Sequence, residues 1–567
     1  MKLIIKQYLA SLRERDELDA ILPDLLSQLG LNVFSKPGRG TRQNGVDVAA
    51  AGSLEGDVEK VYLFSIKAGD LSRKDWDGSS EQSLRPSLNE IIDAYIPNCL
   101  PPEHKEKDIV ICLCFGGDIK EQVRPLVKGY INKNEKVNLT FEEWNGDKLA
   151  ELILVNFLKE ELLPKSAHSQ LRKSLALLDE PEASFQHFRS LIYLLSNTDN
   201  EKIKLTNIRQ INICLWILFS WARESDNLES AYLSSELVVL HSWAIAKEFL
   251  GKKSKTAVAV FEVFNSTIKA YLQITSAFIE DKIFPFTDKK HCISNAVQPS
   301  CSLDVNLKLF DILGRVAMTG IWAYWTLRHI EDKTKEMDAV WAGVKDISDH
   351  IKAIIQNNPI LVLPVKDSQV IDISIAVFLL MTDLNNKQFI KMWLSEMVSR
   401  AKFSFIVKGL YPCTLERYTD LLEHPESKRE DYLEEVTPGS VLFPMISFFA
   451  ALIEDEDIYN QVKEIKTEHL SHCTFQYWFP CDDSENHFYT NSDVHGAAFY
   501  SMNIDHSQYD FIEDVFKECD NSPDCMKLSA VQRNIWPLIF VACRHYRLPI
   551  PIHFFQGFKT QWLNTKG

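Results

Sequence analysis

The stretch VEKVYLFSIK, residues 58–67, decides how the first part of the chain folds, because β-branched and aromatic residues dominate it and favour a strand. Working outward from it, LNVFS at residues 31–35 and VDVAA at residues 46–50 alternate as two shorter strands. DIVICLCF at residues 108–115 is a continuous apolar run, which is typical of a strand buried on both faces. VNLTFEEW at residues 137–144 completes the predicted strands.

Helical patterns separate and flank these strands. Apolar residues recur at helical spacing over residues 4–29, 84–95, 119–132 and 147–163, and Pro164 closes the last of these helices. The predicted order is α-β-β-β-α-β-α-β-α. This order indicates a compact α/β domain over residues 1–165.

The pattern changes after about residue 165, where strand signals fade. The predicted helices there cover residues 206–224, 229–250, 256–280, 304–333, 336–357, 369–400 and 440–465. We therefore expect a large, mainly α-helical region over residues 180–567. It can be subdivided near residue 470, where His, Asn, Asp and aromatic residues become more frequent.

The net charge and the apolar runs of the sequence limit the classes of partner that we expect. The 567 residues carry a formal net charge of −16, so any nucleic-acid site must be a local basic patch. No apolar run reaches the length that spans a bilayer, and the N-terminus lacks the shape of a signal peptide. We therefore expect a cytoplasmic protein that has no membrane partner and whose 12 cysteines are free thiols.

Chemically useful residues gather at the ends of two neighbouring predicted strands. Asp47 lies at the start of the second strand, and Ser65 and Lys67 lie at the end of the third. Ser65 and Lys67 are two residues apart, so their side chains point to the same face of the sheet. With a carboxylate-rich first helix, this arrangement resembles the PD-(D/E)xK restriction-endonuclease-like superfamily, and most closely its Mrr-type nuclease domains, over roughly residues 6–163.

The resemblance implies a restriction-endonuclease-like fold and a Mg²⁺- or Mn²⁺-dependent deoxyribonuclease. Asp47 would be a hard oxygen ligand of the ion, which acidifies a bound water and stabilises charge on the phosphate. Lys67 would orient the attacking water and offset charge on the scissile phosphate.

Ser65 departs from the pattern of the superfamily, which usually has Asp, Glu or Gln at this position. The missing carboxylate could come from Glu90 on the following helix or from Glu17 on the first helix. Glu14 competes with Glu17, because it is in line with the apolar stripe of that helix, where a carboxylate is costly unless it has a partner. Alternatively, all three are solvated helix charges, or the domain binds DNA or a protein without cutting.

Basic residues bracket the predicted site. Lys36, Arg39 and Arg42 precede Asp47 in a glycine-containing loop, and a further pair follows Lys67. This second pair is Arg73 and Lys74. The grouping predicts a clamp for DNA phosphates, and the alternative is an ordinary solvated loop.

The architecture as a whole pairs a nuclease-like domain with a large helical region. It resembles effectors of bacterial antiphage defence and restriction, which implies a sensing or oligomerising role for the helices and a homo-oligomer or a defence-system partner. A His- and Cys-rich segment over residues 469–495 contains possible metal ligands: His469, His472, Cys473, Cys481, Asp482, Asp483, His487, Asp493 and His495. Within it, His469 and His472 have a spacing seen in zinc ligands, and the alternative is a polar loop. A helical regulatory protein without a nucleic-acid role is the third hypothesis.

Overall fold

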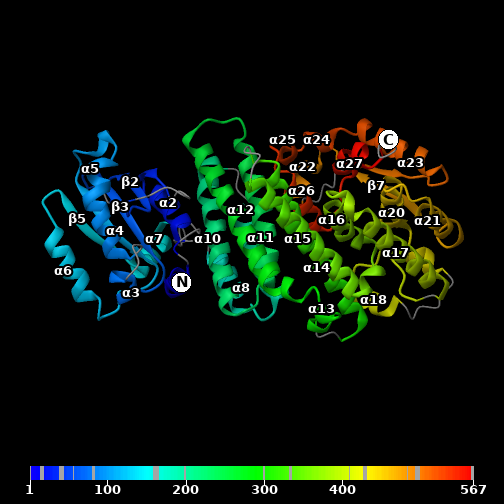
Figure 1. Ribbon diagram of the computed structural model, residues 1–567, viewed down its shortest axis with the longest axis horizontal. Coiled ribbons are helices and arrows are strands. Elements are labelled where there is room, and N and C mark those ends of the chain that lie inside the picture. The colour runs from blue at the N-terminus through cyan, green and yellow to red at the C-terminus, as the bar shows by residue number, and fades with distance from the viewer. Residues whose placement is uncertain are drawn as a thin grey trace. The chain divides into compact units, whose positions relative to one another are not determined.

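The computed structural model divides the chain into two compact units (Figure 1). The first comprises Met1–Val238 and Glu248–Ala270, and the second comprises Val239–Lys247 and Tyr271–Gly567. The structure describes residues 2–12, 14, 18–36, 44–54, 57–78, 83–156, 165–196, 200–297, 300–330, 335–407, 409–424, 431–481, 483–491 and 498–563. None of the helices within these ranges combines the length and the apolar composition that a bilayer crossing needs.

A five-stranded mixed sheet forms the centre of the first unit. Its strands lie in chain order: β1 (Asn32–Ser35), β2 (Val48–Gly52), β3 (Lys60–Lys67), β4 (Ile109–Phe115) and β5 (Leu139–Trp144). The first three strands pair antiparallel, and β3, β4 and β5 pair parallel. All five strands expected from the sequence are present, and every residue of β4 is buried, as its continuous apolar run predicts.

Helices cover both faces of this sheet. One face packs against α3 (Arg73–Asp77), α4 (Leu84–Glu90) and α6 (Arg124–Asn134), through a core that includes Leu63 and Ile111. On the other face, the ring of Phe64 packs edge-on against Trp144, with centroids 5.0 Å apart. The helices α1 (Lys2–Ser11) and α2 (Asp19–Gln28) both contact α7 (Gly146–Asn156).

The first helical stretch differs from the prediction. Residues 4–29 were expected to form a single helix, whereas α1 ends at Ser11 and α2 begins at Asp19. Each of the two helices packs separately against α7. Between them lies Glu14, whose carboxylate contacts the end of β3.

The rest of the first unit is helical. It contains α8 (Lys165–Ala176), α9 (Pro181–Ser196), α10 (Glu201–Glu224) and parts of two longer helices, α11 (Glu229–Ala246) and α12 (Lys255–Lys282). Helix α10 contacts α1, so the sheet and the helices share one compact unit.

The second unit is built mainly from packed helices. Its longest are α14 (Ser302–Leu327), α15 (Lys335–Asn357), α16 (Val370–Met381), α17 (Lys387–Val407), α20 (Leu442–Leu452), α21 (Glu456–Glu468), α23 (Gln508–Asn521) and α26 (Pro537–Tyr546). Shorter helices are α13 (Cys292–Ala296), α18 (Tyr418–Glu423), α19 (Tyr432–Val436), α22 (Ser484–Thr490), α24 (Asp524–Lys527), α25 (Ser529–Gln532) and α27 (Gln556–Leu563). The sequence VIDISIAVFLLM makes α16 buried along its whole length, because α14, α15, α17, α20 and α26 surround it. The prediction of a large helical remainder is therefore confirmed.

One element of the second unit was not predicted. A three-stranded sheet joins β6 (Gly439–Ser440), β7 (Thr474–Phe479) and β8 (Ala498–Ser501) in that order. β6 pairs parallel with β7, and β8 pairs antiparallel with it. β6 and β8 have only two and four residues, whereas β7 has the sequence TFQYWF, whose aromatic residues favour a strand and were a signal that the sequence analysis did not use.

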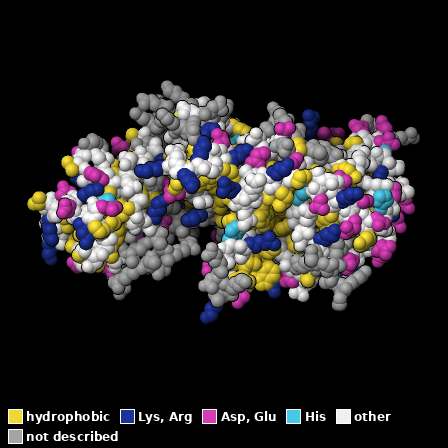
Figure 2. All heavy atoms as spheres, turned by 90° about the horizontal axis from the view of Figure 1, so that it is seen from above, with side chains coloured by type: hydrophobic (Ala, Val, Ile, Leu, Met, Phe, Trp, Pro, Cys, Tyr) yellow, Lys and Arg dark blue, Asp and Glu magenta, His cyan; other side chains and the backbone are white. Residues whose placement is uncertain are grey.

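On the face drawn in Figure 2, basic and acidic side chains are both spread over the surface.

Candidate active site

The pairing of β2 with β3 places Asp47 at the end of the sheet. Val48 is the register partner of Phe64, so residue 47 continues β2 opposite Ser65. The Asp47 backbone N–H donates to the Phe64 carbonyl at 2.8 Å, and the Asp47 carboxylate accepts a hydrogen bond from the Ile66 N–H at 2.7 Å. The carboxylate is therefore fixed against the amide that lies between Ser65 and Lys67.

A tight turn leads into this position. Asn44 and Gly45 both have positive φ, of 46° and 81°, which the Asn-Gly sequence favours. A Cβ atom on Gly45 would lie 2.1 Å from the backbone oxygen of Ser87 in α4. Glycine is therefore required here on two grounds, and the turn presses the Asp47 segment against α4.

Lys67 ends β3 and is largely buried. Its side chain is 10% exposed, and its Nζ lies 3.1 Å from Oε1 of Glu14, whose side chain is 33% exposed. A buried ammonium needs an opposite charge or several hydrogen bonds, and Glu14 provides the charge. The structure thus brings Glu14, one of the acids considered from the sequence, to Lys67.

The hydroxyl group of Ser65 is buried without a hydrogen-bond partner. The residue is 1% exposed, and its Oγ contacts no donor or acceptor among the residues that the structure describes. Ser65 and Lys67 share a face of β3, because they are two residues apart on a regular strand. Several other buried hydroxyl groups of the described residues also lack a partner, so what distinguishes Ser65 is its place, opposite residue 47 and on the same face of β3 as Lys67.

The other two acids proposed from the sequence remain predictions. Glu90 is the last residue of α4 and is half-buried. Glu17 lies outside the described residues. Within the described ranges, no group of three or more His, Cys, Asp or Glu side chains is arranged to hold a metal ion.

The basic residues that were predicted to clamp DNA phosphates have different surroundings in the structure. Nζ of Lys36 lies 3.1 Å from the Glu262 carboxylate of α12, so this lysine already has an acidic partner. Arg73 and Lys74 are exposed on α3, which begins six residues after Lys67. The other two residues of the clamp, Arg39 and Arg42, lie outside the described residues.

The His- and Cys-rich segment does not gather its described side chains into one site. Nε2 of His472 contacts Thr437 Oγ1 at 2.8 Å, whereas the ring of His469 stacks on Phe405. Cys473 is buried, and burial raises the pKa of its thiol to about 12. Asp482, Asp493 and His495 lie outside the described residues.

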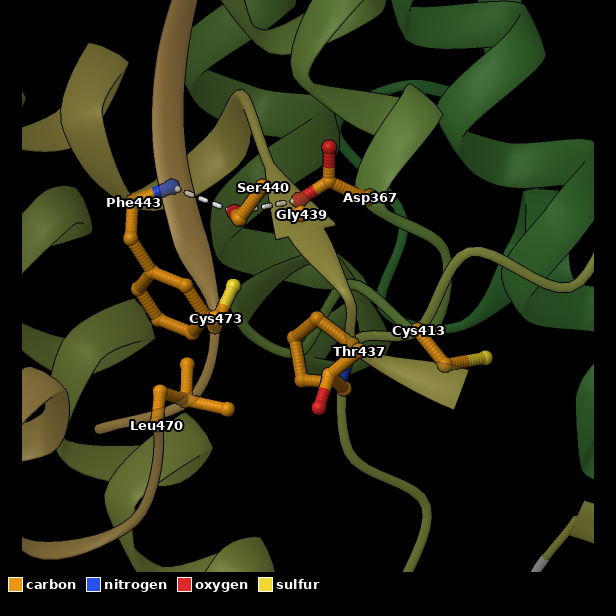
Figure 3. A pocket seen from close by; sticks show the side chains of 9 residues that line it. Asp367, Cys413, Thr437, Gly439, Ser440, Phe443, Leu470 and Cys473 are labelled. Atoms are coloured by element: carbon orange, nitrogen blue, oxygen red, sulfur yellow. Dashed lines mark hydrogen bonds between the residues drawn. The ribbon is translucent and has the colours of Figure 1, made fainter. Parts of the chain in front are cut away.

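A small pocket lies in the second unit, where several of its lining residues come from segments distant in the sequence (Figure 3). At its edge, the half-buried Asp367 carboxylate accepts hydrogen bonds from Ser440 Oγ and from the backbone N–H groups of Val441 and Leu442, at the start of α20. Burial raises the pKa of Asp367, and these three donors oppose that effect. Asp367 therefore acts as a helix cap, and nothing in its local sequence distinguishes it from a surface acid.

Comparisons with known proteins add no relative. No protein-family model, no curated protein and no solved structure matches this chain.

Proposed function

We propose that the protein is a metal-dependent nuclease that hydrolyses DNA phosphodiester bonds at the end of β3. The observation that carries the proposal is a grouping of three charged residues at the end of β3: Lys67 contacts Glu14, and Asp47 accepts a hydrogen bond from the backbone N–H of Ile66, next to Lys67. The order and pairing of β1 to β5 agree with the α-β-β-β-α-β order expected of a restriction-endonuclease-like domain. These features support the proposal together, since neither a lone Asp nor a lone Lys would.

The donors present suit a hard divalent cation. Asp47 and Glu14 offer carboxylate oxygens and Ser65 offers a hydroxyl, and Mg²⁺ is commonly held by one or two carboxylates together with substrate phosphate and water. Mg²⁺ or Mn²⁺, when bound, would polarise the phosphoryl oxygen and acidify a water molecule. Asp47 and Glu14 are the residues that would hold it.

The residues of the chain have distinct parts in the proposed reaction. The ammonium of Lys67 would offset the charge that develops on the scissile phosphate, and its burial strengthens that interaction by lowering the local dielectric constant. Glu14, as its partner, would keep this ammonium oriented. Arg73 and Lys74, exposed on α3, would contact flanking phosphates and so position the duplex.

A second candidate function is a nuclease-like scaffold that binds DNA or a protein without cutting it. The observation in its favour is Ser65, which puts a neutral hydroxyl where the superfamily usually has an acid. Under this alternative, Glu14 and Lys67 form a structural ion pair.

Plasmid cleavage separates the two candidates. Purified full-length protein should nick or linearise plasmid DNA in Mg²⁺ or Mn²⁺ but not in EDTA, and Asp47→Asn should abolish cleavage while leaving the circular dichroism spectrum unchanged. Equal cleavage by wild type and Asp47→Asn would refute the assignment of the site. Retention of plasmid in a gel-shift assay, without cleavage in either metal, would favour the scaffold.

The wider role follows from the architecture. We infer that the large helical remainder regulates or oligomerises the nuclease domain, as in effectors of bacterial antiphage defence or restriction, and this step is an analogy at the level of architecture. Size-exclusion chromatography with light scattering, with and without DNA, would test the oligomeric part of the inference.

A further inference from the structure

We propose that Ser65 makes divalent-cation binding at this site conditional on a bound phosphodiester. The inference rests on the proposed function and extends it to the regulation of the same site. It starts from the Ser65 hydroxyl, which is 1% exposed and has no hydrogen-bond partner within the described residues. Ser65 lies opposite residue 47 and shares a face of β3 with Lys67, so a ligand bound beside these residues brings an oxygen to which the hydroxyl can donate.

Each of the two carboxylates at the end of β3 already has one oxygen engaged by a protein donor. Oδ2 of Asp47 accepts the Ile66 N–H at 2.7 Å, and Oε1 of Glu14 contacts the Lys67 ammonium at 3.1 Å. Both interactions withdraw negative charge from the place where a cation would bind. The oxygen that Ser65 contributes carries no formal charge.

Cation affinity at oxygen sites rises with the number of charged ligands. A carboxylate at position 65 would add a full negative charge to the end of β3, directly opposite residue 47 in the strand register. Serine withholds that charge. The protein alone should therefore bind Mg²⁺ or Mn²⁺ weakly.

A phosphodiester supplies what the protein lacks. It brings one negative charge and two non-bridging oxygens, and its negative charge competes with Glu14 for the ammonium of Lys67. The Ser65 hydroxyl then has an oxygen to which it can donate. The cation and the DNA thus bind together, which keeps a chain that carries a nuclease site free of bound cation until DNA is present.

Calorimetric titration of Mn²⁺ tests this dependence directly. Mn²⁺ is titrated into the full-length protein alone and into the protein saturated with a phosphorothioate duplex, which resists hydrolysis, and the titration of duplex without protein is subtracted. We expect at least tenfold tighter binding when the duplex is bound. Equal affinity with and without duplex, or no binding in either state, would overturn the proposal.

Two nearly isosteric variants isolate the role of charge at position 65. Ser65→Asp should bind Mn²⁺ at least tenfold more tightly than wild type in the absence of DNA, whereas Ser65→Asn should stay within about threefold of wild type. If the two variants behave alike, charge at this position does not govern affinity and the proposal fails. The wild-type titrations decide the question by themselves if Ser65→Asp does not fold.

Failure of this inference is distinguishable from failure of the proposed function. If the protein cleaves plasmid in Mg²⁺ but binds Mn²⁺ equally with and without duplex, the proposed function stands and the inference about Ser65 fails. If the protein neither cleaves plasmid nor shows duplex-dependent Mn²⁺ binding, both the proposed function and the inference fail.

Discussion

Replacing Lys67 by Met should leave the fold stable and remove the activity, whereas replacing its partner should weaken the fold. The two side chains differ in exposure, because Lys67 is 10% exposed and Glu14 is 33% exposed. Lys67→Met preserves the buried aliphatic stem and leaves Glu14 able to turn toward water. The expected loss of stability is about 1 kcal/mol, because the partly exposed Glu14 regains contact with water and is not left as a buried, unpaired charge. Glu14→Gln instead leaves a buried ammonium without its counter-charge, which should cost roughly 1–3 kcal/mol.

Hydrogen exchange measures this asymmetry at the site itself. In a chain of two compact units, global unfolding is not a two-state transition, so local protection is the appropriate readout. Peptides covering β3 and β4 should exchange at the wild-type rate in Lys67→Met and faster in Glu14→Gln. Plasmid cleavage should fall at least a hundredfold in Lys67→Met. The reasoning is refuted if Lys67→Met unprotects β3 as strongly as Glu14→Gln, because the lysine would then be structural, or if Lys67→Met still cleaves at the wild-type rate.

Three further predictions test other parts of the first unit. Burial raises the pKa of Asp24 to about 6, against the opposing charge of Arg209 in α10. The protonated Asp24 carboxyl therefore contributes stability that is complete below about pH 4 and is lost as the pH rises through about 6, so melting curves at pH 5 and pH 8 should differ less in Asp24→Asn than in wild type. Gly45→Ala should unprotect the Asp47 segment to hydrogen exchange and reduce cleavage, because the added Cβ would lie 2.1 Å from the Ser87 carbonyl oxygen; wild-type behaviour would show that the turn relaxes easily. In the native protein, a maleimide should label the exposed Cys99 before the buried Cys112 and Cys114 of β4. Mass spectrometry after short exposure gives the order, and earlier labelling of Cys112 or Cys114 would contradict the burial of β4.

The sheet was largely predictable, because its signals are local. Alternation and β-branched composition locate each of the five strands, and the continuous apolar run at residues 108–115 indicates the strand that is buried on both faces. Helix ends were less predictable. The range 369–400 was expected as one helix, but α16 ends at Met381, and the side chain of Asp383 then accepts a hydrogen bond from the Asn385 N–H at the start of the next turn. A local cap of this kind interrupts a helix without interrupting its apolar periodicity.

In the small sheet of the second unit, β7 has a strand-like composition, but β6 and its pairing with β7 could not be predicted from the sequence. β6 has two residues, and its partner β7 begins 34 residues after the end of β6. A two-residue strand has no period to detect, and its pairing is set by helices that fold around it. The Asp367 cap on α20 is similar, because its hydrogen-bond partners lie 73 to 75 residues away.

Within the candidate site, the shared face of Ser65 and Lys67 was predictable, but the register with β2 and the acidic partner of Lys67 were not. A period of two fixes Ser65 and Lys67 on one face, and antiparallel pairing then sets residue 47 opposite Ser65. Glu14 and Lys67 are separated by 53 residues, and each is anomalous alone: one is an acid in line with an apolar stripe, and the other is a lysine that ends a buried strand. Burying either charge is costly, and the cost falls sharply when the two meet. Two residues of opposite charge at positions that the sequence predicts to be buried are therefore candidates for an ion pair, and the fold determines whether they lie close enough to form it.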